Sequence, residues 1–197
     1  DVELIVDTFD KMNNVFHDGL KEENSVCNGC FKILRTKSTK IAYDKGIKYI
    51  VTGFSRGQIF DLRLSDIYKQ GIFDSDKIEE KKFEQRILYH GIHDYVTSYL
   101  DEDMLLARKA IENTEIIDFY RYTDVSKKEI LDYLRTKNDY WKNPSDTGFC
   151  SSNCLINDVG IFIQRKERGY DNYTYPTSWE VRTNHISLDE ALIEYKG

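Results

Sequence analysis

Two closely spaced pairs of cysteines, far apart along the chain, constrain the fold more than any other feature of the sequence. Cys27 and Cys30 form a C-x-x-C motif, Cys150 and Cys154 form a C-x-x-x-C motif, and the chain contains no other cysteine. Two thiolates at such a spacing can bind one soft metal ion, and a second pair completes a tetrahedral site or a set of cluster ligands. The sequence therefore predicts a fold that brings all four cysteines to one metal site.

Other interpretations of the cysteines account for less of the pattern. Four cysteines in 197 residues are too few for a disulfide scaffold in a chain long enough to form its own core. Unrelated buried thiols, which pack as small hydrophobic groups, would not explain the pairing or the Asn28 and Gly29 between the first two. A shared metal or iron–sulfur site, or a redox pair working with it, is favoured, and spacing alone does not separate zinc from iron–sulfur.

The composition indicates an acidic, soluble protein. The net charge of −6 argues against a protein built mainly to grip a nucleic-acid backbone. No apolar run approaches the roughly 18 residues that a membrane-spanning helix needs. Reduced, paired cysteines fit a cytoplasmic protein, so we expect a cytoplasmic location and no membrane partner.

The order of predicted elements indicates an α/β fold with a parallel sheet and crossover helices, followed by a mostly helical C-terminal part. Apolar runs predict strands at 2–6, 47–52 and 116–120. Helical periodicity or capping boxes predict helices at 9–20, after Cys30 as far as Gly46, at 76–100 and 103–112, and from Ser126, Cys154 and Ser187. Both cysteine pairs then lie at helix starts, where the helix dipole is expected to lower the thiol pKa.

The loop after the strand at 47–52 is a candidate ligand site. It contains Gly53, Ser55, Arg56 and Gln58, and ligands of open α/β sheets bind at the carboxyl ends of the strands. Glycine allows close backbone approach, and arginine can pair with phosphate or carboxylate. An ordinary turn with a surface arginine explains the same residues equally well.

The remaining candidates are interpreted as structural. Of the four histidines only His90 and His93 are close in sequence, and we expect them in the core or on the surface rather than on a metal. The arginines Arg63, Arg121 and Arg182 are expected to be solvated or paired structurally.

Several segments together resemble the PP-loop ATP pyrophosphatases, also called adenine nucleotide alpha hydrolases. They are Cys27 to Lys32 with the helix that follows, Tyr49 to Gln58, Pro144 to Gly148, the Cys150–Cys154 pair, Asn157 to Gly160 and Lys166 to Tyr170. The layout is similar to that of the tRNA 2-thiocytidine synthetases. The resemblance covers nearly the whole chain.

The resemblance implies an enzyme that uses ATP, with Mg²⁺, to adenylate a carbonyl oxygen before a sulfur or nitrogen nucleophile displaces AMP. Cys27, Cys30 and one or both of Cys150 and Cys154 would hold an iron–sulfur cluster or zinc, and the loop of Gly53, Ser55, Arg56 and Gln58 would face the nucleotide. We expect Cys150, Cys154 and Arg56 to take part in the reaction.

The implied organisation has two parts and several partners. Residues 1–75 would be the C-terminal part of a nucleotide-binding α/β domain, and residues 76–197 a helical region packed on it as one unit. The substrate would be a small molecule or a carrier-bound group, with tRNA less favoured by the acidity, and the chain could form a homodimer.

The chain departs from the family pattern in two places. The phosphate-binding S-G-G-x-D-S loop occurs nowhere in it, so we expect an N-terminal segment to supply that loop. Phe54 to Gln58 stand where the thiocytidine enzymes carry a histidine and acids, which implies a different substrate. A sugar amidotransferase of the same superfamily with a structural zinc, and a non-catalytic module stapled by zinc, remain alternatives.

Overall fold

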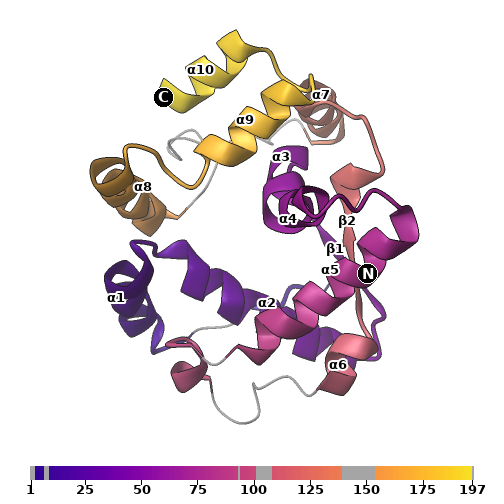
Figure 1. The fold of residues 1–197 in the computed structure, drawn as a ribbon, viewed down its shortest axis with the longest axis vertical. Coiled ribbons are helices and arrows are strands. Elements are labelled where there is room, and N and C mark those ends of the chain that lie inside the picture. Colours follow the sequence, from indigo (N-terminus) through magenta and orange to yellow (C-terminus); the bar gives the residue numbers. More distant parts are fainter. Residues whose placement is uncertain (1–2, 7–8, 93, 101–107, 139–153, 197) are drawn as a thin grey trace.

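The computed structural model describes residues 3–6, 9–92, 94–100, 108–138 and 154–196. It shows a mixed α/β chain in which many helices surround a small parallel sheet (Figure 1). The expected mixture of helices with a parallel sheet is confirmed at this level. A complete PP-loop arrangement remains a proposal.

The sheet contains two strands, β1 (Tyr49–Thr52) and β2 (Glu115–Asp118). They run parallel, with Tyr49 opposite Glu115 and Thr52 opposite Asp118. Parallel strands need a long crossover connection, which is formed here by residues 53–114. Because β2 lies within the region predicted as helical, the sheet joins residues 1–75 to residues 76–197.

The predicted strand at 2–6 is wrong in its described part. Residues 3–6 form neither helix nor strand, and Leu4 and Val6 are 83% and 77% exposed. An apolar run becomes a buried strand only when a neighbouring strand accepts its backbone hydrogen bonds. In the described part of the chain β1 pairs only with β2, so these residues have no such neighbour.

Two helices precede β1, namely α1 (Met12–Glu23) and α2 (Cys27–Asp44). Helix α2 starts at Cys27, whereas the helix was predicted to follow Cys30, so the C-x-x-C motif is its first turn. Val15 of α1 and Ile33 of α2 pack with Val96 in one buried cluster. Past the end of α2, Gly46 adopts a φ of +67°, a conformation that favours glycine.

The crossover is built from short helical pieces and one longer helix. They are α3 (Arg56–Ile59), the π-helix η1 (Phe60–Leu64), α4 (Ser65–Lys69), α5 (Ser75–Gly91), the 3₁₀ turn η2 (Thr97–Tyr99) and α6 (Arg108–Glu112). Ile59, Leu64, Ile67 and Ile78 form its buried core. The helix predicted to run to residue 100 ends at Gly91, because Asp94 and Thr97 exchange side-chain and backbone hydrogen bonds in a polar turn.

The chain after β2 is helical. Its elements are the 3₁₀ turn η4 (Phe119–Arg121), α7 (Lys127–Lys137), α8 (Leu155–Arg168), α9 (Thr174–Arg182) and α10 (Leu188–Lys196). The capping boxes predicted at Ser126 and Ser187 are both formed. Gly169 ends α8 at a φ of +77°.

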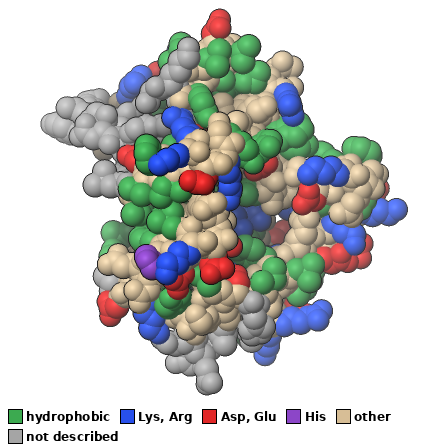
Figure 2. All heavy atoms as spheres, turned by 60° about the vertical axis from the view of Figure 1, so that its left-hand side comes forward, with side chains coloured by type: hydrophobic (Ala, Val, Ile, Leu, Met, Phe, Trp, Pro, Cys, Tyr) green, Lys and Arg blue, Asp and Glu red, His purple; other side chains and the backbone are tan. Residues whose placement is uncertain are grey.

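The surface mixes charged and apolar side chains. Figure 2 turns the side that carries α1 and α8 forward and shows hydrophobic side chains exposed between charged ones. Phe162 of α8, for example, is 67% exposed. None of the helices in the described ranges has the length and apolarity to cross a membrane.

Candidate functional site

The fold brings three of the four cysteines together. Cys27 and Cys30 lie in the first turn of α2, and Cys154 is the residue just before α8. The start of α8 lies next to the start of α2 (Figure 1), and Cys154 is close enough to influence the ionisation of both α2 thiols. The fourth predicted ligand, Cys150, lies outside the described residues.

Close packing fixes the approach of α8 to the α1–α2 connection. Gly160 of α8 faces Val26, and a Cβ placed on this glycine would lie 2.9 Å from a Val26 methyl group. Arg168 Nη2 donates a 2.6 Å hydrogen bond to the Glu23 carbonyl oxygen. One turn into α8, the buried Asn157 Oδ1 accepts a hydrogen bond from Cys27 Sγ at 3.4 Å. We refer to Cys27, Cys30, Cys154 and Asn157 as the cysteine junction.

The predicted lowering of the thiol pKa is wrong for the α2 pair. Burial, followed by the nearby Cys30 and Cys154, raises the pKa of Cys27 to about 11. Burial and then Cys154 also raise the pKa of Cys30. Desolvation of a buried thiolate thus outweighs the favourable field at the helix start. In the absence of a bound cation, these two thiols are protonated at neutral pH.

The described atoms do not form a complete metal site. Within the described ranges, no three of the Cys, His, Asp and Glu side chains are grouped so that they could hold a metal ion. The donor set nevertheless fits a soft metal, since it combines thiols with a buried amide whose Nδ2 atom on Asn157 has no hydrogen-bond partner there. Turning this amide by 180° would direct Nδ2 at Cys27 Sγ, where it could donate to a metal-bound thiolate.

The loop predicted to face the nucleotide is occupied by contacts within the protein. Ser55 and Gln58 form a capping box that begins α3. The Arg56 guanidinium donates to the carbonyl oxygens of Thr123 and Val125. These three side chains therefore have structural partners, whereas a Cβ on Gly53 would meet open space.

Gly57 in the same loop is required by packing against α9 and not by a ligand. A Cβ at this position would lie 2.0 Å from the Pro176 carbonyl oxygen, and the Gly57 N–H donates to Glu180 Oε1 at 2.5 Å. The close backbone approach expected of a glycine at this loop is therefore an approach to α9. Sequence reasoning missed α9, where aromatic residues conceal the helical pattern.

Arginine and histidine residues behave largely as expected. Arg63 pairs with Asp118 at 2.7 Å and Arg121 pairs with Glu79, so both are structural pairs. His90 is partly buried on α5, and His93 lies outside the described residues. Burial and the positive charges of Arg86, Arg35 and Lys32 lower the pKa of His90 to about 4.

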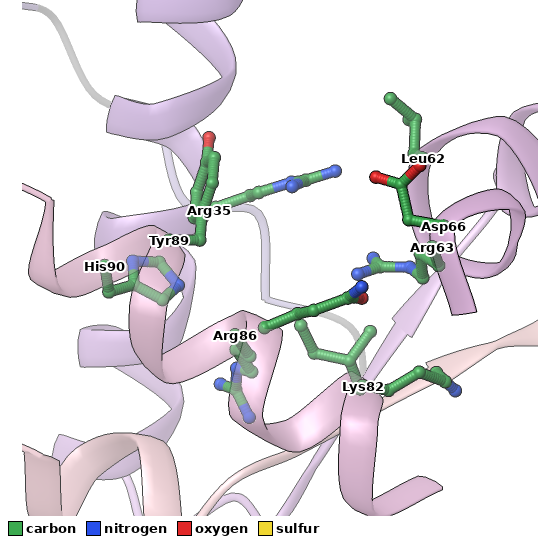
Figure 3. A pocket seen from close by; sticks show the side chains of 10 residues that line it. Arg35, Leu62, Arg63, Asp66, Lys82, Arg86, Tyr89 and His90 are labelled. Atoms are coloured by element: carbon green, nitrogen blue, oxygen red, sulfur yellow. The ribbon is translucent and has the colours of Figure 1, made fainter. Parts of the chain in front are cut away.

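One group of functional candidates was missed by the sequence analysis. Arg35, Arg63 and Arg86 come from three different elements and line one pocket with His90 (Figure 3). The only hint along the chain is the i, i+4 spacing of Phe31 and Arg35 on α2, since the guanidinium lies 5.8 Å from the Phe31 ring centroid. We call this the arginine pocket.

Comparison of the chain with models of known protein families, with curated proteins and with solved structures gives no match in any of the three.

Proposed function

We propose that the cysteine junction is a metal-binding centre within an ATP-dependent adenylating enzyme of the PP-loop type. The observation that carries this proposal is the position of Cys154 beside Cys27 and Cys30, although more than a hundred residues separate them. Unrelated structural thiols would have no reason to gather at one place. The enzyme would activate a carbonyl for thiolation or amidation, together with a segment that supplies the phosphate-binding loop.

The burial of the thiols and the Nδ2 atom of Asn157, which has no hydrogen-bond partner in the described part of the chain, support a bound cation at the cysteine junction. Burial, followed by the nearby Cys30 and Cys154, raises the pKa of Cys27 to about 11, whereas a coordinated metal deprotonates its thiol ligands. The buried Nδ2 atom of Asn157 would then have a thiolate to which it could donate. Cys150 would be the fourth ligand, and zinc or an iron–sulfur cluster would suit a set of four thiolates.

Metal analysis of protein purified without oxygen tests the metal centre. We expect bound zinc or iron at a fixed ratio to the chain, with visible absorbance if the metal is an iron–sulfur cluster. Each of the four single replacements by serine, at Cys27, Cys30, Cys150 and Cys154, should remove most of the metal. The matched control is Asn28→Ala, because Asn28 lies between two of the cysteines but is exposed and donates to the Glu23 carboxylate.

The outcomes separate the parts of the proposal. Equal metal content in the four serine variants and the parent would overturn the metal centre. Binding of AMP to the metal-loaded protein, measured by calorimetry, would support the adenylating enzyme. Metal binding without AMP binding would leave only the structural role.

A second candidate is a non-catalytic module in which the metal joins α2 to α8. It is favoured by the engagement of Ser55, Arg56 and Gln58 within the protein, which leaves the predicted nucleotide loop few free polar groups. Such a module would lose stability on chelation and would not bind AMP.

A further inference from the structure

The arginine pocket lies between α2, η1, α4 and α5, beside the middle of β2. Its volume is about 260 Å³. It is lined by Arg35, Leu62, Arg63, Asp66, Lys82, Gln85, Arg86, Tyr89, His90 and Ile116. None of the cysteines is among them, so the pocket is separate from the cysteine junction. In Figure 3 the Arg35 and Arg63 side chains extend toward one another from opposite sides.

The positive charges around the pocket exceed the negative ones. Arg63 is paired with the fully buried Asp118, and Lys82 is paired with Glu79 at 3.1 Å. Asp66 is the one carboxylate among the lining residues, and it also contacts the exposed Lys69 at 3.0 Å. The other two cations, Arg35 and Arg86, have no carboxylate partner within the described ranges.

Arg86 is a cation of the arginine pocket whose charge is not compensated by any described side chain. Its guanidinium donates to uncharged acceptors only, including the Thr114 carbonyl oxygen at 2.5 Å and Thr39 Oγ1 at 3.2 Å. Burial, together with the charge of Arg63, lowers the pKa of Arg86 to about 10. Cations that are partly removed from water and not compensated raise the free energy of the folded state, and a bound anion would relieve that cost.

Aromatic rings hold the two facing guanidinium groups in place. Arg35 lies 5.1 Å from the Tyr89 ring centroid and 5.5 Å from that of Phe54. Arg63 lies 5.6 Å from the same Phe54 ring. Stacking on aromatic faces reduces the freedom of an arginine side chain without using its N–H donors. One Arg35 donor also interacts with the Tyr89 side chain, and the remaining donors are therefore oriented before any ligand arrives.

We propose that the arginine pocket binds the phosphate group of a small phosphorylated ligand, between the Arg35 and Arg63 guanidinium groups. Guanidinium forks bind phosphate oxygens in pairs, and two forks on opposite sides match a tetrahedral group better than a planar carboxylate. Gln85 adds an amide to the pocket lining. At about 260 Å³, the pocket is smaller than the roughly 300–1,000 Å³ typical for whole small-molecule ligands, so it suits a phosphate with a short organic part.

Calorimetric titration at low ionic strength tests this proposal. Inorganic phosphate and glycerol phosphate are the probes, and acetate is the comparison anion. We expect one saturable site per chain for both phosphates and weaker binding of acetate. Arg35→Gln should weaken phosphate binding by at least about tenfold, because it removes a charged, two-pronged donor. Tighter binding of glycerol phosphate than of phosphate would identify a phosphate ester as the ligand.

The control and the folding check use exposed positions and a conservative change. Arg108→Gln removes an equal charge from an exposed pair with Glu112 and should leave phosphate binding unchanged. Arg35→Lys keeps the charge but loses the fork, so its affinity should fall between those of the parent and Arg35→Gln. Unfolding curves of each variant show that it is folded. Equal phosphate affinity in Arg35→Gln and the parent, or no saturable phosphate binding to the parent, would overturn the proposal.

Discussion

The arginine pocket and the cysteine junction both use α2, but they are held together by different forces. Cys27 and Cys30 lie in the first turn of the helix and Arg35 lies about two turns further on. Around the pocket, buried charges are linked to the sheet through direct polar contacts. At the junction, α8 packs on the α1–α2 connection at Gly160, and a 3.4 Å hydrogen bond joins Cys27 to Asn157. The pocket is thus ordered without a ligand, whereas a ligand would add more stability to the junction than to the pocket.

The sheet provides the fixed frame of the pocket. Asp118, at the end of β2, is fully buried, accepts a 2.7 Å hydrogen bond from Thr52 at the end of β1, and pairs with Arg63 at 2.7 Å. One carboxylate therefore connects both strands to η1. A buried charge that has lost its partner is far more costly than the pair itself is stabilising.

The largest expected effect is on the buried Arg63–Asp118 pair. Arg63→Met should lower the free energy of unfolding by about 3–5 kcal/mol, because it leaves the Asp118 carboxylate buried without a cation. Urea unfolding monitored by circular dichroism measures this value. The double variant Arg63→Met, Asp118→Asn should recover much of the loss, since no lone charge remains. A loss below about 1 kcal/mol in the single variant would show that the pair does not hold the pocket.

A second effect depends on pH and concerns His90 at the edge of the pocket. Its folded-state pKa of about 4 is below the ordinary value of 6.5, so the unfolded chain binds the proton more readily. The stability that the neutral imidazole provides is therefore fully present above pH 6.5 and is lost as the pH falls toward 4. The groups around it are the cations Lys32, Arg35 and Arg86, the Thr36 hydroxyl at 3.4 Å from Nδ1, and the Tyr89 ring, 5.1 Å away.

His90→Gln isolates this contribution from that of the acidic residues. Between pH 7 and pH 4 the parent should lose about 3 kcal/mol more than the variant, a value that follows from the size of the pKa difference. Urea unfolding at a series of pH values gives the comparison. Parallel pH profiles for the two proteins would mean that His90 is exposed to water in the folded state.

The two regions also differ in how far the sequence could predict them. The cysteine junction was expected because C-x-x-C and C-x-x-x-C are local patterns with a known chemical purpose. The capping boxes at Ser126 and Ser187 were predicted for the same reason, since each is complete within four residues. Local signals of this kind survive folding because tertiary contacts seldom overturn them.

The arginine pocket and the thiol pKa values depend on tertiary contacts instead. Arg35 and Arg63 face each other only because the fold places α2 and η1 on opposite sides of one pocket, and no spacing along the chain records this. The pKa of Cys27 depends on its burial, which outweighs the helix dipole. In the same way, the apolar run at 3–6 could not reveal that no described strand lies beside it.

The third effect concerns the packing of the junction. Gly160→Ala should lower the free energy of unfolding by about 1–2 kcal/mol, because its new methyl group would meet the stiff, buried Val26 side chain at 2.9 Å. Gly91→Ala is the matched control, since a Cβ on Gly91 at the end of α5 meets no atom within 4 Å. That change should raise stability by up to about 1 kcal/mol through helix propensity. Equal effects at both positions in denaturant unfolding would show that α8 does not press on Val26.

The smallest effect is expected at Cys27 in metal-free protein. Cys27→Ser keeps a donor for Asn157 Oδ1 in place of a 3.4 Å thiol hydrogen bond, so the free energy of unfolding should change by less than about 1 kcal/mol. With zinc in excess, the parent should gain more than about 2 kcal/mol and the variant little, because binding to the folded state alone stabilises it by mass action. Unfolding curves with zinc and with a chelator measure both differences. If zinc stabilised the two proteins equally, the junction would be a packing contact, and the contrast with the arginine pocket would rest on charge alone.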